Sequence, residues 1–328
     1  MGKNQEGYSA DDILKQVKKA IDILQKYYPD QDDVLVYDNH FTREGCAELP
    51  WLGQVDAVDA DITDGPKLHR ELLRFAPDVL CHLAALHYIP YCDQHPAETL
   101  RVNVEGTLNV MLAAGEIKPL KGILFASSVA VYAPTDAYHT EIDQPSPSDI
   151  YGLSKWLAEQ VVEQYARRLK VSHLSLRFSN LYGPGETNPH VIPAVISQLL
   201  EGADTLHLGR TDPYRDFLYV GDLMKALLMA IPYAMRQEVH QVLNLGAGRE
   251  WPVQEAVDIL CELSGRKVRV VRDEGRVRAV DRMHLRSDVA RARQLLGWEP
   301  QHDLRAGLQK TFQAERAKLS PRMAADKV

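Results

Sequence analysis

The chain has 328 residues, of which 45% are apolar and 25% charged, the composition of an ordinary soluble globular protein. Its formal charge of −7 argues against a general attraction to nucleic acid or to an anionic membrane surface, so we expect neither partner. No apolar run approaches the roughly 18 residues that span a bilayer, and the N-terminus lacks a signal-peptide core. Cys46, Cys81, Cys92 and Cys261 show no C-x-x-C spacing, which favours free thiols and a cytoplasmic location.

Helix and strand patterns alternate through the first half of the chain. Ser9 and Asp12 form a capping pattern before apolar residues at helical spacing, which predicts a first helix at 10–27. Further helices are predicted at 66–75, 96–114, 151–168 and 191–200. Strands are predicted at 34–37, 57–59, 79–83, 122–126 and 173–178. This alternation is typical of an α/β protein with a doubly wound parallel sheet.

One stretch of the predicted helix 151–168 indicates proton transfer. Tyr151 and Lys155 are four residues apart and therefore share a helix face. A phenol is a poor base at neutral pH, and we expect the lysine ammonium to lower the pKa of Tyr151. The apolar strand before this helix ends in Ser127 and Ser128, and Ser128 could donate a hydrogen bond to the oxygen that exchanges its proton with Tyr151. Alone, a Y-x-x-x-K spacing is weak, and a packed tyrosine beside a solvated lysine is the alternative.

The order of these elements resembles that of short-chain dehydrogenases/reductases. From about 33 to 300 the chain is similar to their extended branch, the NAD-dependent epimerase/dehydratase family, with a Rossmann-like fold. The likeness includes Asn103-Val-Glu-Gly-Thr-Leu-Asn109, Arg177-Phe-Ser-Asn-Leu-Tyr-Gly-Pro184 and Asn244-Leu-Gly-Ala-Gly248. The remaining matching segments are 34–39, 59–64, 78–85, 215–220 and 296–300.

The resemblance implies NAD as cofactor and a nucleotide sugar as substrate. The catalytic residues would be Ser128, Tyr151 and Lys155. Residues binding the cofactor would be Asp38, Asn39, Asp61, Ile62, Leu83, Ala84, Ala85, Asn103, Tyr151, Lys155 and Phe178. Residues binding the substrate would be Ser127, Asn180, His190, Arg215, Arg278 and Asp281. Several of these residue types also have ordinary roles: an acid at a strand end can cap a turn, and an arginine can be a solvated surface group.

The same resemblance implies a division of the chain into two lobes. Residues 1–179 would form the dinucleotide-binding domain, with 217–245 packing back onto it. Residues 180–216 and 246–318 would form a smaller α/β lobe that binds the nucleotide sugar, and 319–328 a tail. His82, His87 and His95 are close in sequence, but their spacing fits no zinc pattern, so no metal is expected.

Local sequence favours one activity within the family. Nucleotide-sugar 4,6-dehydratases carry an Asp-Glu pair after the catalytic hydroxyl residue, where this chain has Val129 and Ala130, and the nearby Glu of glucuronate decarboxylases is also absent. The expected function is therefore 4-epimerisation of a UDP- or dTDP-hexose through transient oxidation to a keto sugar, with Tyr151 as acid and base. Family members commonly form homodimers through the helices predicted at 96–114 and 151–168.

One departure from the family concerns the phosphate turn. The family opens with a strand and a G-x-x-G-x-x-G turn that holds the pyrophosphate, and this sequence contains neither. The sheet should therefore have a central gap or an exposed edge, unless a partner chain or a rearranged N-terminus covers it. Three alternatives stay open: an impaired homologue that binds a nucleotide sugar, an N-terminally truncated product, and another NAD-dependent sugar-nucleotide oxidoreductase.

Overall fold

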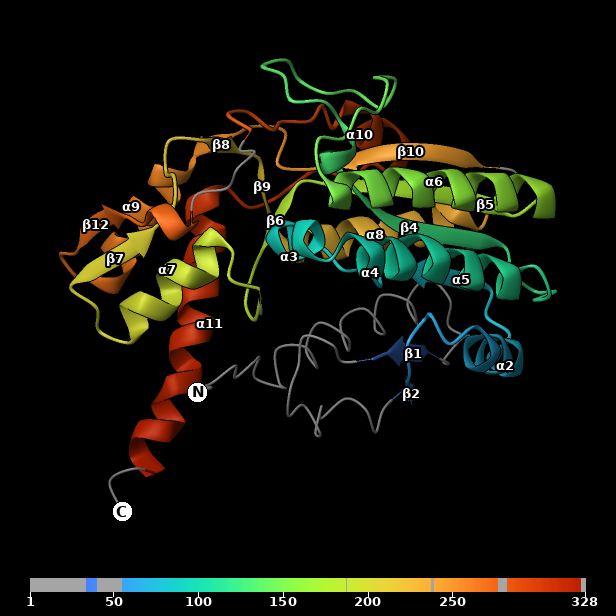
Figure 1. Cartoon of the computed structure of the whole chain (residues 1–328), viewed down its shortest axis with the longest axis horizontal. Coiled ribbons are helices and arrows are strands. Elements are labelled where there is room, and N and C mark those ends of the chain that lie inside the picture. The colour runs from blue at the N-terminus through green and yellow to red at the C-terminus, as the bar shows by residue number, and fades with distance from the viewer. Residues whose placement is uncertain (1–33, 40–54, 187, 237–238, 277–281, 326–328) are drawn as a thin grey trace.

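The structure is a computed structural model that describes residues 34–39, 55–186, 188–236, 239–276 and 282–325, with side chains to 318. The predicted helix at 10–27 and the predicted substrate residues Arg278 and Asp281 lie outside these residues. Figure 1 shows a larger α/β body and a smaller lobe beside it.

A four-stranded parallel sheet forms the centre of the larger body. Its order is β10 (His240–Leu245), β5 (Ser172–Phe178), β4 (Gly122–Ser128) and β3 (Val79–His82). β4 is buried at every position, as expected for a strand covered on both faces, and it runs two residues beyond the predicted end, to Ser128. The carboxyl ends of β4, β5 and β10 meet where Phe178 pairs with Ser128 on one side and with Leu245 on the other.

Helices cover both faces of this sheet, which makes a three-layer α/β fold (Figure 1). One apolar core lies under α2 (Gly65–Phe75), α5 (Gly106–Ala114) and α6 (Ile150–Leu169), and it includes Ile123 and Phe125 of β4. The core on the other face lies under α8 (Val220–Ala234) and α10 (Ala290–Leu296) and includes Leu124. The doubly wound α/β fold predicted from the sequence is confirmed.

The predicted break in the sheet is present in the described part of the chain. β1 (Leu35–Asp38) and β2 (Asp56–Asp59) pair in parallel as a separate two-stranded sheet. Among the described residues no strand joins this pair to β3. Cys81 and Leu83, on and just after β3, are exposed.

The helix predicted at 96–114 consists of three pieces. α3 (Ile89–Gln94) precedes it, and the helix itself runs as α4 (Pro96–Leu100), the π-helical turn η2 (Arg101–Glu105) and α5. Asn103 lies in the π turn, buried against the loop after β3. π turns within helices are frequent at functional sites, which makes Asn103 a residue of interest.

The smaller lobe has its own apolar core. It packs α7 (Val191–Leu200), α9 (Val253–Ser264) and α11 (Leu304–Ala325) with the parallel pair β7 (Thr205–Leu208) and β12 (Arg269–Arg272). Short strands connect the lobe to the larger body: β6 (Asn180–Tyr182) with β9 (Phe217–Tyr219), and β8 (Tyr214–Arg215) with β11 (Trp251–Pro252). The predicted lobe boundaries stay a prediction. Ala292 and Trp298 lie within the range 246–318 assigned to the lobe, but they pack in the core with α8 and not in the core of the lobe.

Two short 3-10 turns complete the described structure, η3 (Val129–Val131) after β4 and η4 (Glu274–Arg276) after β12. Within the described residues, no helix is both long and apolar enough to cross a bilayer, and no cluster of three metal-ligating side chains occurs.

Candidate active site

The end of β4 and the start of α6 bring Ser128 and Tyr151 together. Asp149 caps α6, its Oδ1 accepting a hydrogen bond of 2.7 Å from the amide of Gly152. A Cβ added at Gly152 would lie 2.3 Å from the carbonyl oxygen of Ala130, so only glycine allows the helix to start this close to the turn after β4. The Ser128 hydroxyl accepts from the amide of Ala130 at 3.1 Å and hydrogen-bonds the phenol of Tyr151.

The expected lowering of the Tyr151 pKa is wrong for the chain by itself. Burial raises the pKa of Tyr151 above its usual value, and the Ser128 hydrogen bond, which lowers it, offsets only part of that rise. The phenol is therefore held protonated at neutral pH. Helical spacing predicts that Tyr151 and Lys155 share a helix face, but it does not predict how deeply the phenol is buried.

Lys155 is buried one turn further along α6. Burial lowers its pKa to about 8, and the carboxylate of Glu159 raises it again in part. The Nζ atom lies 4.9 Å from the centre of the Phe125 ring on β4, a cation–π distance. A lysine that loses its proton near neutral pH suits proton-transfer chemistry far better than the solvated surface lysine of the alternative interpretation.

A buried ion pair lies behind these residues and was missed as part of the site. Arg177 on β5 donates two hydrogen bonds to Glu159, at 2.9 and 2.7 Å, and its guanidinium lies 4.8 Å from the centre of the Tyr132 ring. The hydroxyl of Ser127 donates to the same carboxylate. Ser127, predicted to bind substrate, thus holds Glu159. The sequence signal that could have revealed this ion pair is Glu159 itself, an acid four residues after Lys155 and therefore on the same helix face.

The predicted adenosine contacts lie around β1 and β2. The Asp38 carboxylate is exposed at the carboxyl end of β1. Asn39 donates to Asp61 at 2.7 Å, and Asp61 also accepts from the amide and hydroxyl of Thr63. Burial alone would raise the pKa of Asp61, but these hydrogen bonds lower it below its usual value. Ile62 is buried under Gly106 and contributes apolar packing.

The loop after β3 contains the other predicted cofactor contacts. Leu83 and Ala84 are exposed and Ala85 is half-buried, so their surface is available to a ligand. Asn103 fixes the loop: it accepts from the amide of Leu86 at 2.8 Å and donates to the Leu86 carbonyl and to Ser154 of α6, at 2.8 and 2.9 Å. The structure therefore places Asn103 as a support of the loop. Phe178 ends β5, half-buried against the α8 core.

The described residues fit NAD at both of its ends. The exposed carboxylate of Asp38 suits the hydroxyls of a ribose, and Leu83 and Ala84 provide an exposed apolar floor at the carboxyl end of a parallel strand. Tyr151 and Lys155 supply a phenol and an ammonium where a nicotinamide ribose would be held. The pyrophosphate in the middle of NAD lacks its usual binding turn, because the sequence contains no glycine-rich turn.

The predicted substrate residues border the smaller lobe. Arg215 donates through Nη1 to the carbonyls of Tyr214 and Arg282, at 2.7 and 2.8 Å. The Asn180 amide donates to the Asp216 carbonyl at 3.4 Å. His190 precedes α7 and pairs with Glu186.

His87 was also missed as part of the site. It lies on the loop after β3, 6.0 Å from the His190 ring centre, and is hydrogen-bonded to Asn188. The loop after β3 and the segment before α7 thus lie side by side.

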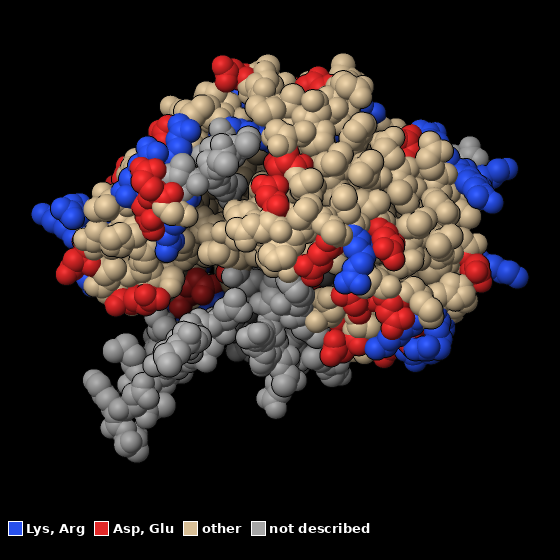
Figure 2. Space-filling view, in the orientation of Figure 1, with Lys and Arg blue, Asp and Glu red and all other residues tan. Residues whose placement is uncertain are grey.

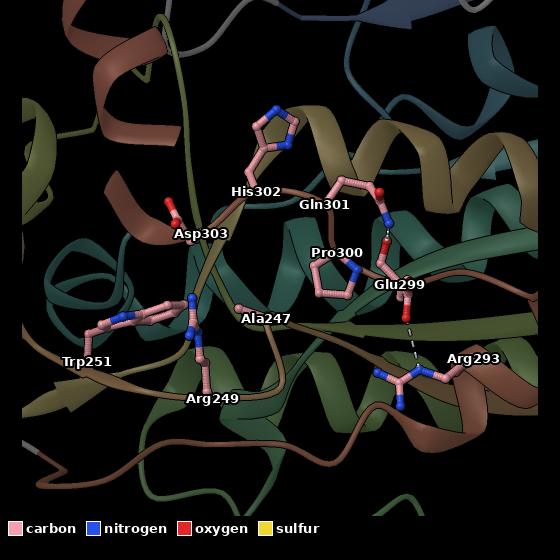
Figure 3. A pocket seen from close by; sticks show the side chains of 9 residues that line it. All are labelled: Ala247, Arg249, Trp251, Arg293, Glu299, Pro300, Gln301, His302 and Asp303. Carbon is pink, nitrogen blue, oxygen red and sulfur yellow. Dashed lines mark hydrogen bonds and ion pairs between the residues drawn. The ribbon is translucent and has the colours of Figure 1, made fainter. Parts of the chain in front are cut away.

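A separate cavity of about 260 Å³ lies where the loop after β10 meets α10 and the segment before α11 (Figure 3). Arg249 stacks on Trp251, with 4.5 Å from the guanidinium carbon to the ring centre, and Arg293 pairs with Glu299 at 3.4 Å. No predicted site residue lines this cavity, and its arginines are balanced by Glu299 and Asp303. It does not belong to the candidate active site.

The sequence is similar to those of known proteins. The sequence profile of the NAD dependent epimerase/dehydratase family matches residues 24–246. A putative UDP-glucose 4-epimerase from Methanocaldococcus jannaschii is 30% identical over 295 residues, which cover 88% of this chain and 92% of that protein. A GDP-6-deoxy-D-mannose reductase from Pseudomonas aeruginosa is 30% identical over 241 residues, 71% of this chain and 78% of the reductase.

The same fold occurs in solved structures. A UDP-glucose 4-epimerase from Thermotoga maritima, crystallised with UDP-glucose, superposes with a TM-score of 0.79 at 25% identity. The match covers 91% of this chain and 95% of the epimerase.

Proposed function

Because this chain belongs to the NAD dependent epimerase/dehydratase family and is therefore an NAD-dependent enzyme, we propose that it inverts carbon 4 of a nucleotide hexose. The carrying observation is that Ser128, the last residue of β4, lies beside Tyr151 and the buried Lys155 of α6. This trio can take a proton from a sugar hydroxyl and return it.

Each residue of the trio has a distinct part in the proposed reaction. Bound NAD supplies the acceptor, and later the donor, of the hydride. Tyr151 must start this step as the phenolate, in which form it accepts the proton of the 4-hydroxyl and gives it back after the keto sugar has turned over. Ser128 orients the phenol and hydrogen-bonds the same sugar oxygen. Lys155, in its charged form, stabilises the phenolate that Tyr151 becomes while it is without its proton.

The residues after Ser128 favour epimerisation over dehydration. Val129 and Ala130 occupy the first positions of η3, both buried, and neither side chain can exchange a proton. Eliminating water from a hexose needs an acid and a base beside the sugar. The chain offers neither here, so the keto sugar has no built-in route to elimination.

Arg215 and Asn180 are the proposed holders of the nucleotide sugar. Both lie in or beside the short strands that connect the smaller lobe to the larger body. A guanidinium can bind diphosphate oxygens in a two-pronged manner, and an amide can bind a sugar hydroxyl.

The test is interconversion of sugar epimers by purified protein. UDP-glucose, UDP-N-acetylglucosamine and UDP-glucuronate are each incubated with and without added NAD, and products are separated by chromatography. We expect conversion of one pair with the wild type and none with Tyr151→Phe. Tyr132→Phe is the matched control, because the Tyr132 hydroxyl bonds Asn244 at 2.7 Å, away from Ser128. No conversion of any of the three by the wild type contradicts the proposal for these sugars.

We also propose that the enzyme is a homodimer that pairs through α5 and α6. Leu112 of α5 and Leu157 of α6 are exposed, at 51% and 36%. Figure 2 shows few charged side chains over the middle of α6. We expect the double variant Leu112→Glu, Leu157→Glu to run as a monomer by light scattering and Met229→Glu, an exposed residue of α8, to leave the dimer intact. A monomeric wild type contradicts this proposal.

A further inference from the structure

Arg282 connects the start of α6 to Arg215 of β8. Its side chain is buried, and its guanidinium donates to the Ser148 hydroxyl at 2.8 Å, to the Ala130 carbonyl at 3.1 Å and to Asp149 Oδ2 at 3.3 Å. Ser148 and Asp149 directly precede α6, and Ala130 lies in η3. One cation therefore holds the two segments that flank Ser128 and Tyr151.

These contacts are the ones that determine where the reacting hydroxyls lie. Asp149 divides its carboxylate: Oδ1 caps α6 at the amide of Gly152, and Oδ2 pairs with Arg282. The Ala130 carbonyl is packed against Gly152, and the Ala130 amide donates to the Ser128 hydroxyl. A shift of Arg282 would thus be felt on both sides of the Ser128–Tyr151 hydrogen bond.

The backbone of Arg282 is attached to the proposed diphosphate residue. Its carbonyl accepts from Arg215 Nη1 at 2.8 Å. The amide of Tyr214 donates to the Met283 carbonyl at 2.7 Å, and the amide of Asp216 donates to that of Leu285 at 3.3 Å. The segment after Arg282 therefore runs beside β8 and is joined to it by these backbone hydrogen bonds.

The arrangement is costly as a purely structural device. Within the described part of the chain, Arg282 Nη1 is buried without a hydrogen-bond partner, which is destabilising. Burial also lowers the pKa of Arg282, which Asp149 only partly restores. A neutral side chain could cap this contact at less cost, so the charge and the fork shape need another reason.

We propose that Arg282 is a positioning residue that couples occupancy of the nucleotide-sugar site at Arg215 to the placement of Ser128 and Tyr151. The inference rests on the proposed function, since it takes a nucleoside diphosphate as the ligand of Arg215. A diphosphate that holds the Arg215 guanidinium fixes the Arg282 carbonyl. The Arg282 guanidinium then holds the α6 cap and η3 more firmly, so bound substrate stabilises the working position of the phenol.

The first measurement follows ligand binding and does not depend on catalytic turnover. UDP alone is added to the wild type, and amide hydrogen exchange is followed in residues 150–156, where the amides of Gly152 and Leu153 are both held by Asp149. We expect UDP to slow exchange there at least about fivefold in the wild type. In Arg282→Met, UDP should still bind, with Kd within about threefold, but the slowing should be lost. Asp149→Asn, which keeps a capping oxygen but removes the charge, should behave like Arg282→Met.

Kinetics gives the second readout. In Arg282→Met we expect kcat to fall about 10- to 100-fold, with KM within about threefold. Arg282→Lys restores the charge and should recover part of kcat. Arg286→Met is the matched control from the same segment: Arg286 pairs with Glu250 at 3.2 Å and stacks on Tyr138, away from α6, and should keep both the slowing and kcat.

The outcomes separate the two proposals. A wild type that does not bind UDP overturns the nucleotide-sugar assignment and the coupling together. A wild type that binds UDP and epimerises, beside an Arg282→Met variant that keeps the slowing and kcat, overturns the coupling alone. If Arg282→Met does not fold, Arg282→Lys and Asp149→Asn decide the question by the same two readouts.

Discussion

Glu159 and Arg177 form a doubly hydrogen-bonded ion pair between α6 and β5, with each side chain only 4% exposed. The pair fixes α6 to the sheet one turn beyond Lys155. It also places a negative charge close enough to raise the pKa of Lys155 against the effect of burial. Helix position and lysine charge state therefore depend on the same carboxylate.

Breaking this pair from one side should cost much stability. Arg177→Met takes from the buried Glu159 carboxylate its paired guanidinium and two hydrogen bonds, so we expect the free energy of unfolding to fall by about 3–5 kcal/mol in urea titrations. The control is Arg167→Met on the same helix, which breaks the exposed Arg167–Glu163 pair and should cost less than about 1 kcal/mol. Equal losses in the two variants would contradict the importance of burial.

Lys155→Met should stabilise the protein while abolishing activity. The folded pKa of Lys155, about 8, is below its usual 10.5, so between these values the unfolded chain binds more protons and wild-type stability rises with pH. Below pH 8 the buried charge is a cost, on the order of 3 kcal/mol. We expect Lys155→Met to be the more stable protein at pH 7 and to lose this advantage by pH 10. An advantage that does not change with pH would count against the shifted pKa.

Ser128→Ala should change the pH profile and not only the rate. The Ser128 hydrogen bond lowers the pKa of Tyr151, so its removal lets burial raise that pKa further. We expect kcat to fall about 10- to 100-fold and the acidic limb of the kcat profile to move to higher pH. Ser175→Ala is the matched control, because it removes a buried hydroxyl that has no hydrogen-bond partner in the described structure. An unmoved acidic limb would contradict the role of Ser128.

Asn103→Ala should weaken cofactor binding without touching the reacting groups. The change removes three hydrogen bonds that hold the loop after β3 to the π turn and to α6. Leu83 and Ala84 would then lose their fixed placement, and we expect the affinity for NAD to fall about tenfold, measured by calorimetric titration. Asn103→Asp keeps the acceptor for the Leu86 amide, so its affinity for NAD should lie between those of the wild type and Asn103→Ala. Unchanged NAD affinity in Asn103→Ala would separate this loop from the cofactor.

Much of the fold follows from local sequence because its signals are local. Apolar runs such as 122–128 and 173–178 predict strands covered on both faces, and the apolar spacing of 191–200 predicts the helix found there, Val191–Leu200. The separation of β1 and β2 from β3 among the described strands agrees with the lack of an apolar strand pattern before the first predicted helix. The π turn at Asn103 has no such signal, because it depends on a side chain reaching the backbone of Leu86.

The sequence by itself determined that a phenol, an ammonium and two hydroxyls would meet in a parallel α/β fold, since helical spacing and strand order are properties of the chain. Only the tertiary structure decided their protonation. Burial sets the pKa of Tyr151 and Lys155, and burial depends on how α6 packs against β4. The same holds for Glu159 with Arg177 and for Arg282 with Asp149, whose partners are distant in sequence and become neighbours only when the sheet and the two lobes have assembled.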